Sequence, residues 1–99
     1  MVARIASFEG LDVQAARNTF AAGEAIIQPV LAGLDGFQSS LALLSDDGRM
    51  LSITIFETDA NAEAAEATLD QRLPELLGDL FADWAGRRVS VDHYQVLAR

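Results

Sequence analysis

The 99-residue sequence contains no cysteine and no lysine, and it has one histidine and two prolines. The absence of cysteine excludes disulfide bonds, thiolate catalysis and cysteine-held metal clusters. Because the chain also has only one histidine, the ligands of a zinc site would be almost all carboxylates, so we expect no metal site. The sequence also lacks the glycine-rich and nucleophile motifs of nucleotide-binding proteins and hydrolases, and we expect no cofactor.

Positive charge is scarce, because seven arginines face 15 acidic residues and the net charge is −8. Such a chain is repelled by phosphate backbones and anionic lipids, so neither nucleic acid nor a membrane surface is expected as a partner. No apolar run approaches the roughly 20 residues of a membrane span. Residues 1–8 contain an arginine and do not resemble a signal peptide, and we therefore expect a cytoplasmic protein.

Hydrophobic residues make up 51% of the chain, which is typical of a folded domain. The length allows a single domain over residues 1–99. Apolar and alternating patterns predict strands over residues 2–8, 37–44, 50–57 and 88–97. Apolar residues at spacings of three and four predict a helix from Asp12 to about residue 34, and another from Thr58 or Asp59 to Trp84. Pro29 and Pro74 are expected to kink or divide these helices.

This βαββαβ order predicts the α+β ferredoxin-like fold, an antiparallel sheet with both helices on one face. We expect the helices to cover the more aliphatic face, which holds Ile5, Ser7, Ser39, Leu41, Leu43, Ile53, Ile55, Val89, Val91 and His93. The bare face would hold Arg4, Ala6, Phe8, Ala42, Leu44, Met50, Ser52, Thr54, Phe56, Tyr94 and Val96. Its apolar side chains predict a homodimer in which two sheets pack face to face.

The hairpin between the two central strands contains Asp46, Asp47 and Gly48. A two-residue turn would pair leucines with the wrong face of the partner strand. A three-residue loop over 46–48 instead pairs Leu43 with Leu51 and Leu41 with Ile53. We therefore predict the longer loop, with Gly48 in a left-handed conformation.

Several features together resemble the dimeric α/β-barrel superfamily, in particular its antibiotic-biosynthesis-monooxygenase-like group. They are Gly36-Phe37 after the first helix, the strand end Phe56-Glu57-Thr58, the helix start Asp59-Ala60-Asn61-Ala62 and the final strand Tyr94-Gln95-Val96-Leu97. The resemblance implies the fold and a dimeric α/β barrel. The group includes cofactor-free oxygenases, haem-degrading enzymes, isomerases and proteins of no known activity. The haem-degrading branch uses a histidine on the second helix, which is absent here.

Candidate site residues follow from the expected cavity between the helices and the covered face. His93 is the candidate catalytic base, with Phe20, Ser39 and Trp84 as ligand-binding residues and Ser7 as a further polar group. The alternative is that Phe20, Leu69, Leu80 and Trp84 close the space, leaving His93 a buried core residue. Asp92 points to the opposite face from His93 and cannot orient it.

The other charged residues have structural interpretations that we prefer. Four acidic residues recur at helical spacing, and we interpret them as a solvated helix flank rather than a metal site. They are Asp59, Glu63, Glu66 and Asp70. Arg87 and Arg88 suit a helix C-terminus better than an anion site. Arg4 is expected to pair with Asp92 on the neighbouring strand.

Two hypotheses for function remain from the sequence. The first is a cofactor-free, monooxygenase-like enzyme acting on a small aromatic or polyketide-like substrate in a dry pocket. The second is a non-catalytic homodimer that binds a small apolar or aromatic ligand or serves a structural role, as in ferredoxin-like amino-acid-binding modules. A cavity of a few hundred Å³ reaching His93 would favour the enzyme.

Overall fold

The computed structural model describes the backbone of all 99 residues and every side chain except those of residues 80, 81 and 83. The elements follow the predicted order, with one additional short helix before the last strand. They are β1 (Val2–Phe8), α1 (Val13–Ala32), β2 (Phe37–Leu44), β3 (Met50–Phe56), α2 (Asp59–Leu77), α3 (Asp79–Ala85) and β4 (Arg88–Gln95).

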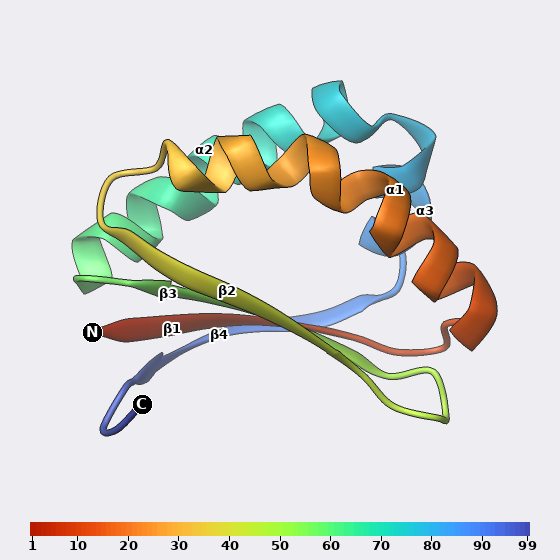
Figure 1. Cartoon of the computed structure of the whole chain (residues 1–99), viewed down its shortest axis with the longest axis horizontal. Helices are drawn as coiled ribbons and strands as arrows, with labels where there is room; N and C mark the ends of the chain where they lie inside the picture. The colour runs from red at the N-terminus through yellow and green to blue at the C-terminus, as the bar shows by residue number, and fades with distance from the viewer.

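The four strands form one antiparallel sheet in the order β2-β3-β1-β4. The helices all lie on one side of this sheet, and the other side is uncovered (Figure 1). This is the ferredoxin-like α+β fold that the sequence predicted. In the described part of the chain, no helix is long and apolar enough to cross a membrane.

Both long helices begin where the sequence predicted, because a side chain caps each one. The Asp12 carboxylate accepts a hydrogen bond from the Ala15 amide at 2.8 Å, and Thr58 Oγ1 accepts one from the Asn61 amide at 3.1 Å. Neither proline divides a helix, contrary to that part of the expectation, since α1 continues through Pro29 and α2 through Pro74. The second helical stretch breaks instead at Gly78, whose φ of +55° favours glycine.

The assignment of sheet faces was wrong for β1, β2 and β3. Phe56 is fully buried and packs with Val2 against Ala62 and Ala65 of α2, so the helices cover the face that was expected to be bare. The aliphatic face is the open one, and Leu41 and Leu43 are 57% and 47% exposed on it. Both faces carry enough apolar side chains to pack, so alternation along single strands could not distinguish them.

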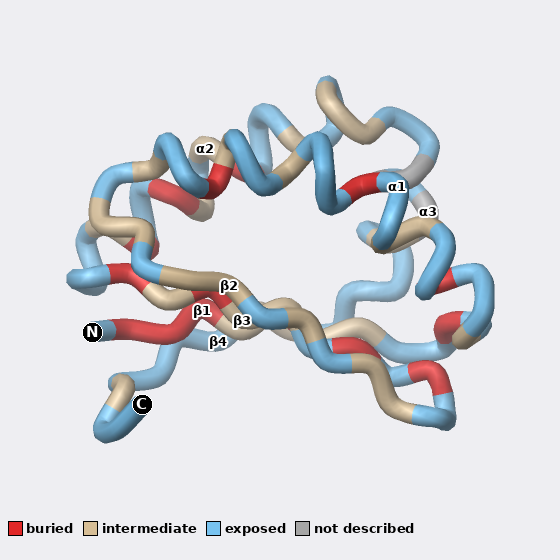
Figure 2. Tube along the Cα trace, viewed as in Figure 1, coloured by how far each residue is buried: buried red, intermediate tan, exposed pale blue. Residues whose placement is uncertain are grey.

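Two clusters of buried apolar residues lie at opposite ends of the covered face (Figure 2). The first joins Val2 and Phe56 to α2. The second contains Leu11, Ala16 and Met50, with Phe8, Leu44 and Trp84 packed against it. The region between the clusters is the part of the covered face where a cavity can form.

The β2–β3 hairpin has the predicted register. Leu43 pairs with Leu51 and Leu41 pairs with Ile53, and the loop spans residues 46–48. Gly48 has a φ of +83°, as expected for the left-handed position. Its carbonyl accepts a hydrogen bond from the Leu11 amide at 3.0 Å, which ties the hairpin to the chain entering α1.

Gly48→Ala should therefore destabilise the protein. The alanine would carry a positive φ, which costs about 1–2 kcal/mol, and its Cβ would collide with the Leu11 carbonyl oxygen. Urea denaturation followed by circular dichroism measures the loss. Gly33→Ala is the matched control, because Gly33 has an ordinary φ of −86° and only ordinary contacts around a Cβ. Equal stabilities of the two variants would contradict this account of the hairpin.

Candidate functional site

A row of polar side chains crosses the covered face of the sheet. Ser40 pairs with Thr54, Thr54 pairs with Arg4, and Arg4 pairs with His93, so the four residues lie side by side on four adjacent strands. Arg4 and Thr54 are buried, with 7% and 4% of their surface accessible. Buried polar groups are costly unless they are bonded or used, which makes this row the most unusual feature of the interior.

The next row towards the hairpin consists of small side chains. Ala42 pairs with Ser52, and Ser52 pairs with Ala6. Above them, α1 presents Gly23, whose lack of a side chain leaves further space near Leu77. Small residues on both layers leave unfilled volume, and the structure contains a cavity of about 380 Å³ there.

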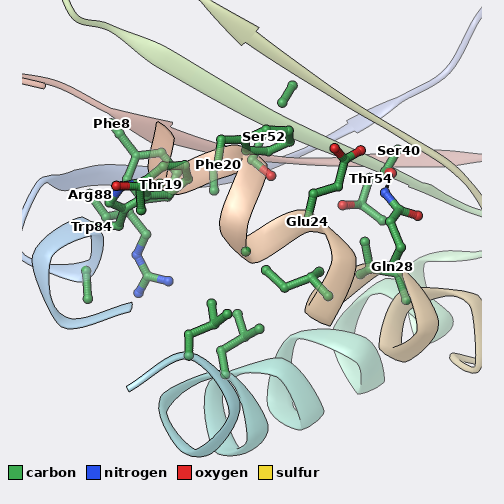
Figure 3. Close-up of a pocket in the computed structure, with 18 of the residues that line it drawn as sticks. Phe8, Thr19, Phe20, Glu24, Gln28, Ser40, Ser52, Thr54, Trp84 and Arg88 are labelled. Carbon is green, nitrogen blue, oxygen red and sulfur yellow. Dashed lines mark hydrogen bonds between the residues drawn. The ribbon is translucent and has the colours of Figure 1, made fainter. Parts of the chain in front are cut away.

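Aromatic side chains form one end of this cavity (Figure 3). The rings of Phe20 and Trp84 stack with centroids 6.2 Å apart and an angle of 14° between their planes. Phe8 contacts Trp84 in a tilted arrangement at 5.8 Å. The result is an apolar, flat-sided wall of the kind that accepts an aromatic ring.

Glu24, Gln28, Ser40 and Thr54 lie together at the other end, whereas Thr19 and Arg88 lie beside the aromatic side chains (Figure 3). Gln28 Nε2 donates a hydrogen bond to Ser40 Oγ at 3.2 Å, which connects α1 to the edge strand β2. Arg4 lines the cavity beside Thr54. The cavity thus has the apolar body and the few converging polar groups of a small-ligand site.

Acidic residues of α2 lie over the β1–β4 side of the polar row. Glu66 Oε1 is 3.7 Å from Arg4 Nε, and Glu66 Oε2 is 3.5 Å from His93 Nε2. Asp59 Oδ1 is 3.8 Å from His93 Nδ1, and Asp70 Oδ1 is 3.9 Å from Arg88 Nη1. Three members of the predicted carboxylate row therefore face positive or titratable groups of the sheet, which corrects the expected pairing of Arg4 with Asp92.

These residues do not form a metal centre. Among the residues that the structure describes, no group of three or more histidine or acidic side chains is placed to hold a metal ion. Burial lowers the pKa of the Arg4 guanidinium, although Glu66 and Asp70 oppose that effect. The site is therefore organised around a desolvated cation with acidic neighbours.

The structure places the sequence-predicted site residues in two different regions. Phe20 and Trp84 line the cavity together, and the cavity lies between the helices and the covered face as expected. Ser39 does not, because it pairs with Ile55 on the open face and accepts a hydrogen bond from Arg99. The side chain of Leu80, expected to help close the space, lies outside the described residues.

His93 faces the helices as predicted, but it is neither a core residue nor part of the cavity lining. Its side chain remains 26% exposed at the sheet edge beside Asp59 and Glu66. Both acids that approach the imidazole therefore come from α2. This arrangement differs from both sequence interpretations, a buried histidine and a histidine inside a pocket.

Sequence reasoning missed Ser40, Thr54 and Gln28, and it gave Arg4 a structural role in place of a site role. The alternating patterns of β1 and β3 do place Arg4 and Thr54 on a common face, and an arginine within an apolar strand is the signal that could have drawn attention to them. That signal was assigned to a dimer interface because the aliphatic face was expected beneath the helices.

With this geometry established, comparison with known structures defines the class of the fold. It is the fold of the antibiotic biosynthesis monooxygenase structures, a dimeric α/β-barrel group, and the similarity extends over nearly the whole chain. No protein-family model matches the sequence, and no curated protein is detectably similar to it. The similarity is therefore one of structure.

Three solved structures illustrate it. One, from Bordetella bronchiseptica and named for the antibiotic biosynthesis monooxygenases, has a TM-score of 0.72 and 22% identity, over 98% of this chain and 97% of the other. A Streptomyces coelicolor monooxygenase bound to nanaomycin D has a TM-score of 0.75 and 15% identity, over 99% and 88%. A mutant of a cofactor-independent oxygenase from Streptomyces nogalater has a TM-score of 0.65 and 15% identity, over 99% and 94%.

Removal of one ring should reveal how the aromatic end is packed. In Phe20→Ala, Trp84 would lose its stacked partner and face more water, so its fluorescence emission should move to longer wavelength. Stability should fall by less than the ~3–5 kcal/mol of a fully buried phenylalanine, because Phe20 is half-buried. Trp84 is the only tryptophan, so the emission reports this site alone.

Phe37→Ala is the control for this variant, since Phe37 contacts Phe56 at the opposite end of the covered face. It should lower stability without moving the Trp84 emission. An equal spectral shift in both variants would contradict the stacked geometry.

Proposed function

We propose that the protein is a cofactor-independent, monooxygenase-like enzyme that binds a small aromatic or polyketide-like substrate in its cavity. The single observation that carries this proposal is the cavity itself, with a stacked aromatic wall at one end and a polar row at the other. Its volume of about 380 Å³ falls in the range of small-molecule sites.

Because an aromatic wall forms one end of the cavity and polar side chains lie at the other, the cavity suits a flat substrate with oxygen atoms at one end. Phe20 and Trp84 would stack on the ring system, while Ser40 and Thr54 would bind substrate oxygens through their hydroxyl groups. Such contacts fix the orientation of the ring and keep water away from the reacting carbon.

The reaction class can be written without a redox group on the protein. A ring methylene that loses a proton becomes a carbanion, and the substrate then supplies all the electrons for molecular oxygen. One oxygen atom forms the new carbonyl and the other leaves as water, so CH₂ plus O₂ gives C=O plus H₂O. The protein would contribute binding, orientation and proton transfer.

The alternative is a protein that binds the same type of ligand without catalysis. The observation that favours it is the position of His93, which lies outside the cavity lining and leaves no histidine beside the bound ligand. Glu24 and Asp70 do line the cavity and are the acidic groups available for proton transfer. Oxygen consumption distinguishes the two possibilities.

Binding and turnover should be measured with an anthrone, whose central CH₂ group is the type of carbon described above. We expect quenching of Trp84 fluorescence and consumption of one O₂ per quinone formed, above the rate without protein. Phe20→Ala should weaken binding about tenfold, the equivalent of the ~1.4 kcal/mol of an aromatic pair. Arg17→Gln on the exposed face of α1 is the control.

Each outcome of that experiment has a clear meaning. Quenching without oxygen consumption would favour the binding protein, and an absence of quenching would overturn the cavity proposal. His93→Phe should change affinity by no more than about twofold, as for a substitution outside the site. A large loss in that variant would restore His93 as a site residue.

The open face of the sheet supports a second part of the proposal, a homodimer in which two such faces pack together. All four strands contribute apolar side chains to this face, and an uncovered surface rich in such side chains marks an interface. They are Ile5, Leu41, Leu43, Leu51, Ile53, Ile55 and Tyr94. The same face-to-face packing was expected from the sequence, but through the opposite set of residues.

The double variant Leu41→Glu, Leu43→Glu should dissociate the dimer, because a carboxylate in the interface would lose its water. Light scattering should give twice the 10.6 kDa chain mass for the native protein and a single chain mass for the variant. Leu97→Glu is the control, since Leu97 is 92% exposed beyond the last strand. A native protein that scatters as a monomer would exclude the arrangement.

A further inference from the structure

Arg4 is a buried cation in the cavity lining, and the proposed function assigns it no role. It sits on β1, a central strand of the sheet, and its side chain keeps only 9% of its accessible surface. An arginine in this position gives up most of its hydration, and a simple core would use an aliphatic residue there. Its retention in the interior therefore calls for a partner.

The described residues do not supply a complete partner. Arg4 Nε has no hydrogen bond with any of them, and the nearest carboxylate oxygen, on Glu66, is 3.7 Å away. Glu66 is shared between two basic side chains, because its Oε2 lies 3.5 Å from His93 Nε2. A guanidinium has five N–H donors, no hydrogen bond from Arg4 to a described residue satisfies them, and the residue belongs to the cavity lining.

The surrounding charges compensate Arg4 only in part. Burial lowers the pKa of Arg4 and is the largest influence on it; Glu66 and Asp70 oppose this effect, and Arg88 adds to the lowering. Additional negative charge at the guanidinium would therefore be favourable, even though the protein as a whole is acidic. Thr54 pairs directly with Arg4, and its hydroxyl could donate to the same oxygen.

We propose that Arg4 is the specificity-determining residue of the cavity and selects aromatic ligands that carry an ionised oxygen. The planar guanidinium would hold a carboxylate, phenolate or enolate oxygen at the polar end, while the ring of the ligand reaches the Phe20–Trp84 wall. Charge-assisted bonds of this kind are about twice as strong as neutral ones. The inference rests on the proposed function only for the binding of an aromatic ligand, and it does not require turnover.

The test compares two probes that differ in charge but hardly in shape, anthraquinone-2-carboxylate and anthraquinone-2-carboxamide. Both are read by quenching of Trp84, so only binding near the aromatic wall is detected. The native protein should bind the carboxylate about 10–100-fold more tightly than the amide, which corresponds to the usual strength of a hydrogen bond to a charged group. Arg4→Met should reduce this ratio to about one and leave amide binding nearly unchanged.

Two further variants locate the effect. Arg17→Gln removes an exposed arginine outside the cavity and should keep the ratio, whereas Arg88→Gln removes the other arginine of the lining and should lower the ratio by less than Arg4→Met does. Glu66→Gln removes the competing carboxylate, so the ratio should rise several-fold. Because Glu66 is 32% exposed, this last variant is expected to fold even if Arg4→Met does not.

The results separate this inference from the function on which it rests. Amide binding without a preference for the carboxylate would overturn the role of Arg4 while leaving the aromatic site intact. A preference that persists in Arg4→Met, disappears in Arg88→Gln or is unchanged in Glu66→Gln would also overturn it. Quenching by neither probe would count against the aromatic site itself and against Arg4 as its selector.

Discussion

The structure depends on the register of the four strands, which places the cationic side chain of Arg4 inside the protein. Pairing across β2, β3, β1 and β4 aligns Ser40, Thr54, Arg4 and His93 beneath the helices. A charge on the covered face of a central strand is tolerable only if opposite charge approaches from the other layer. The acidic flank of α2 provides this, with Glu66 between Arg4 and His93 and Asp70 near Arg88. The polar row thus helps to decide which side of α2 faces the sheet.

The same constraint explains why a cavity exists. Apolar packing is concentrated at the two ends of the covered face, where Phe56 contacts α2 and where Met50 contacts the start of α1. Between them lie small side chains, Ala6, Ala42 and Ser52, and the polar row. Neither group fills the space below the helices, and the stacked rings of Phe20 and Trp84 close one end of it. Stability and ligand binding therefore use different parts of one interior surface.

Much of the fold could be predicted because it depends on local patterns. The strand boundaries, the caps at Asp12 and Thr58 and the three-residue hairpin loop all follow from neighbouring residues. The candidate site was predicted less completely. Phe20 and Trp84 were found because aromatic residues on an apolar helix stripe must face the sheet. Ser39 was chosen in place of Ser40 because the strand faces were inverted, and Arg4 was assigned to the wrong surface for the same reason.

By itself, the sequence determined the order of the strands and the two long helices, the residues at which those helices begin, and the two sets of side chains on each strand. It also determined that a chain without cysteine and with one histidine has few ways to bind a metal. Only the tertiary structure decided which face the helices cover. Alternation divides the side chains of a strand into two sets but does not show which set is buried, and here both sets are apolar enough to pack. The decision depends on contacts between strands and helices far apart in the chain. Those contacts buried Arg4 and Thr54, exposed Leu41 and Leu43, and left His93 at the edge.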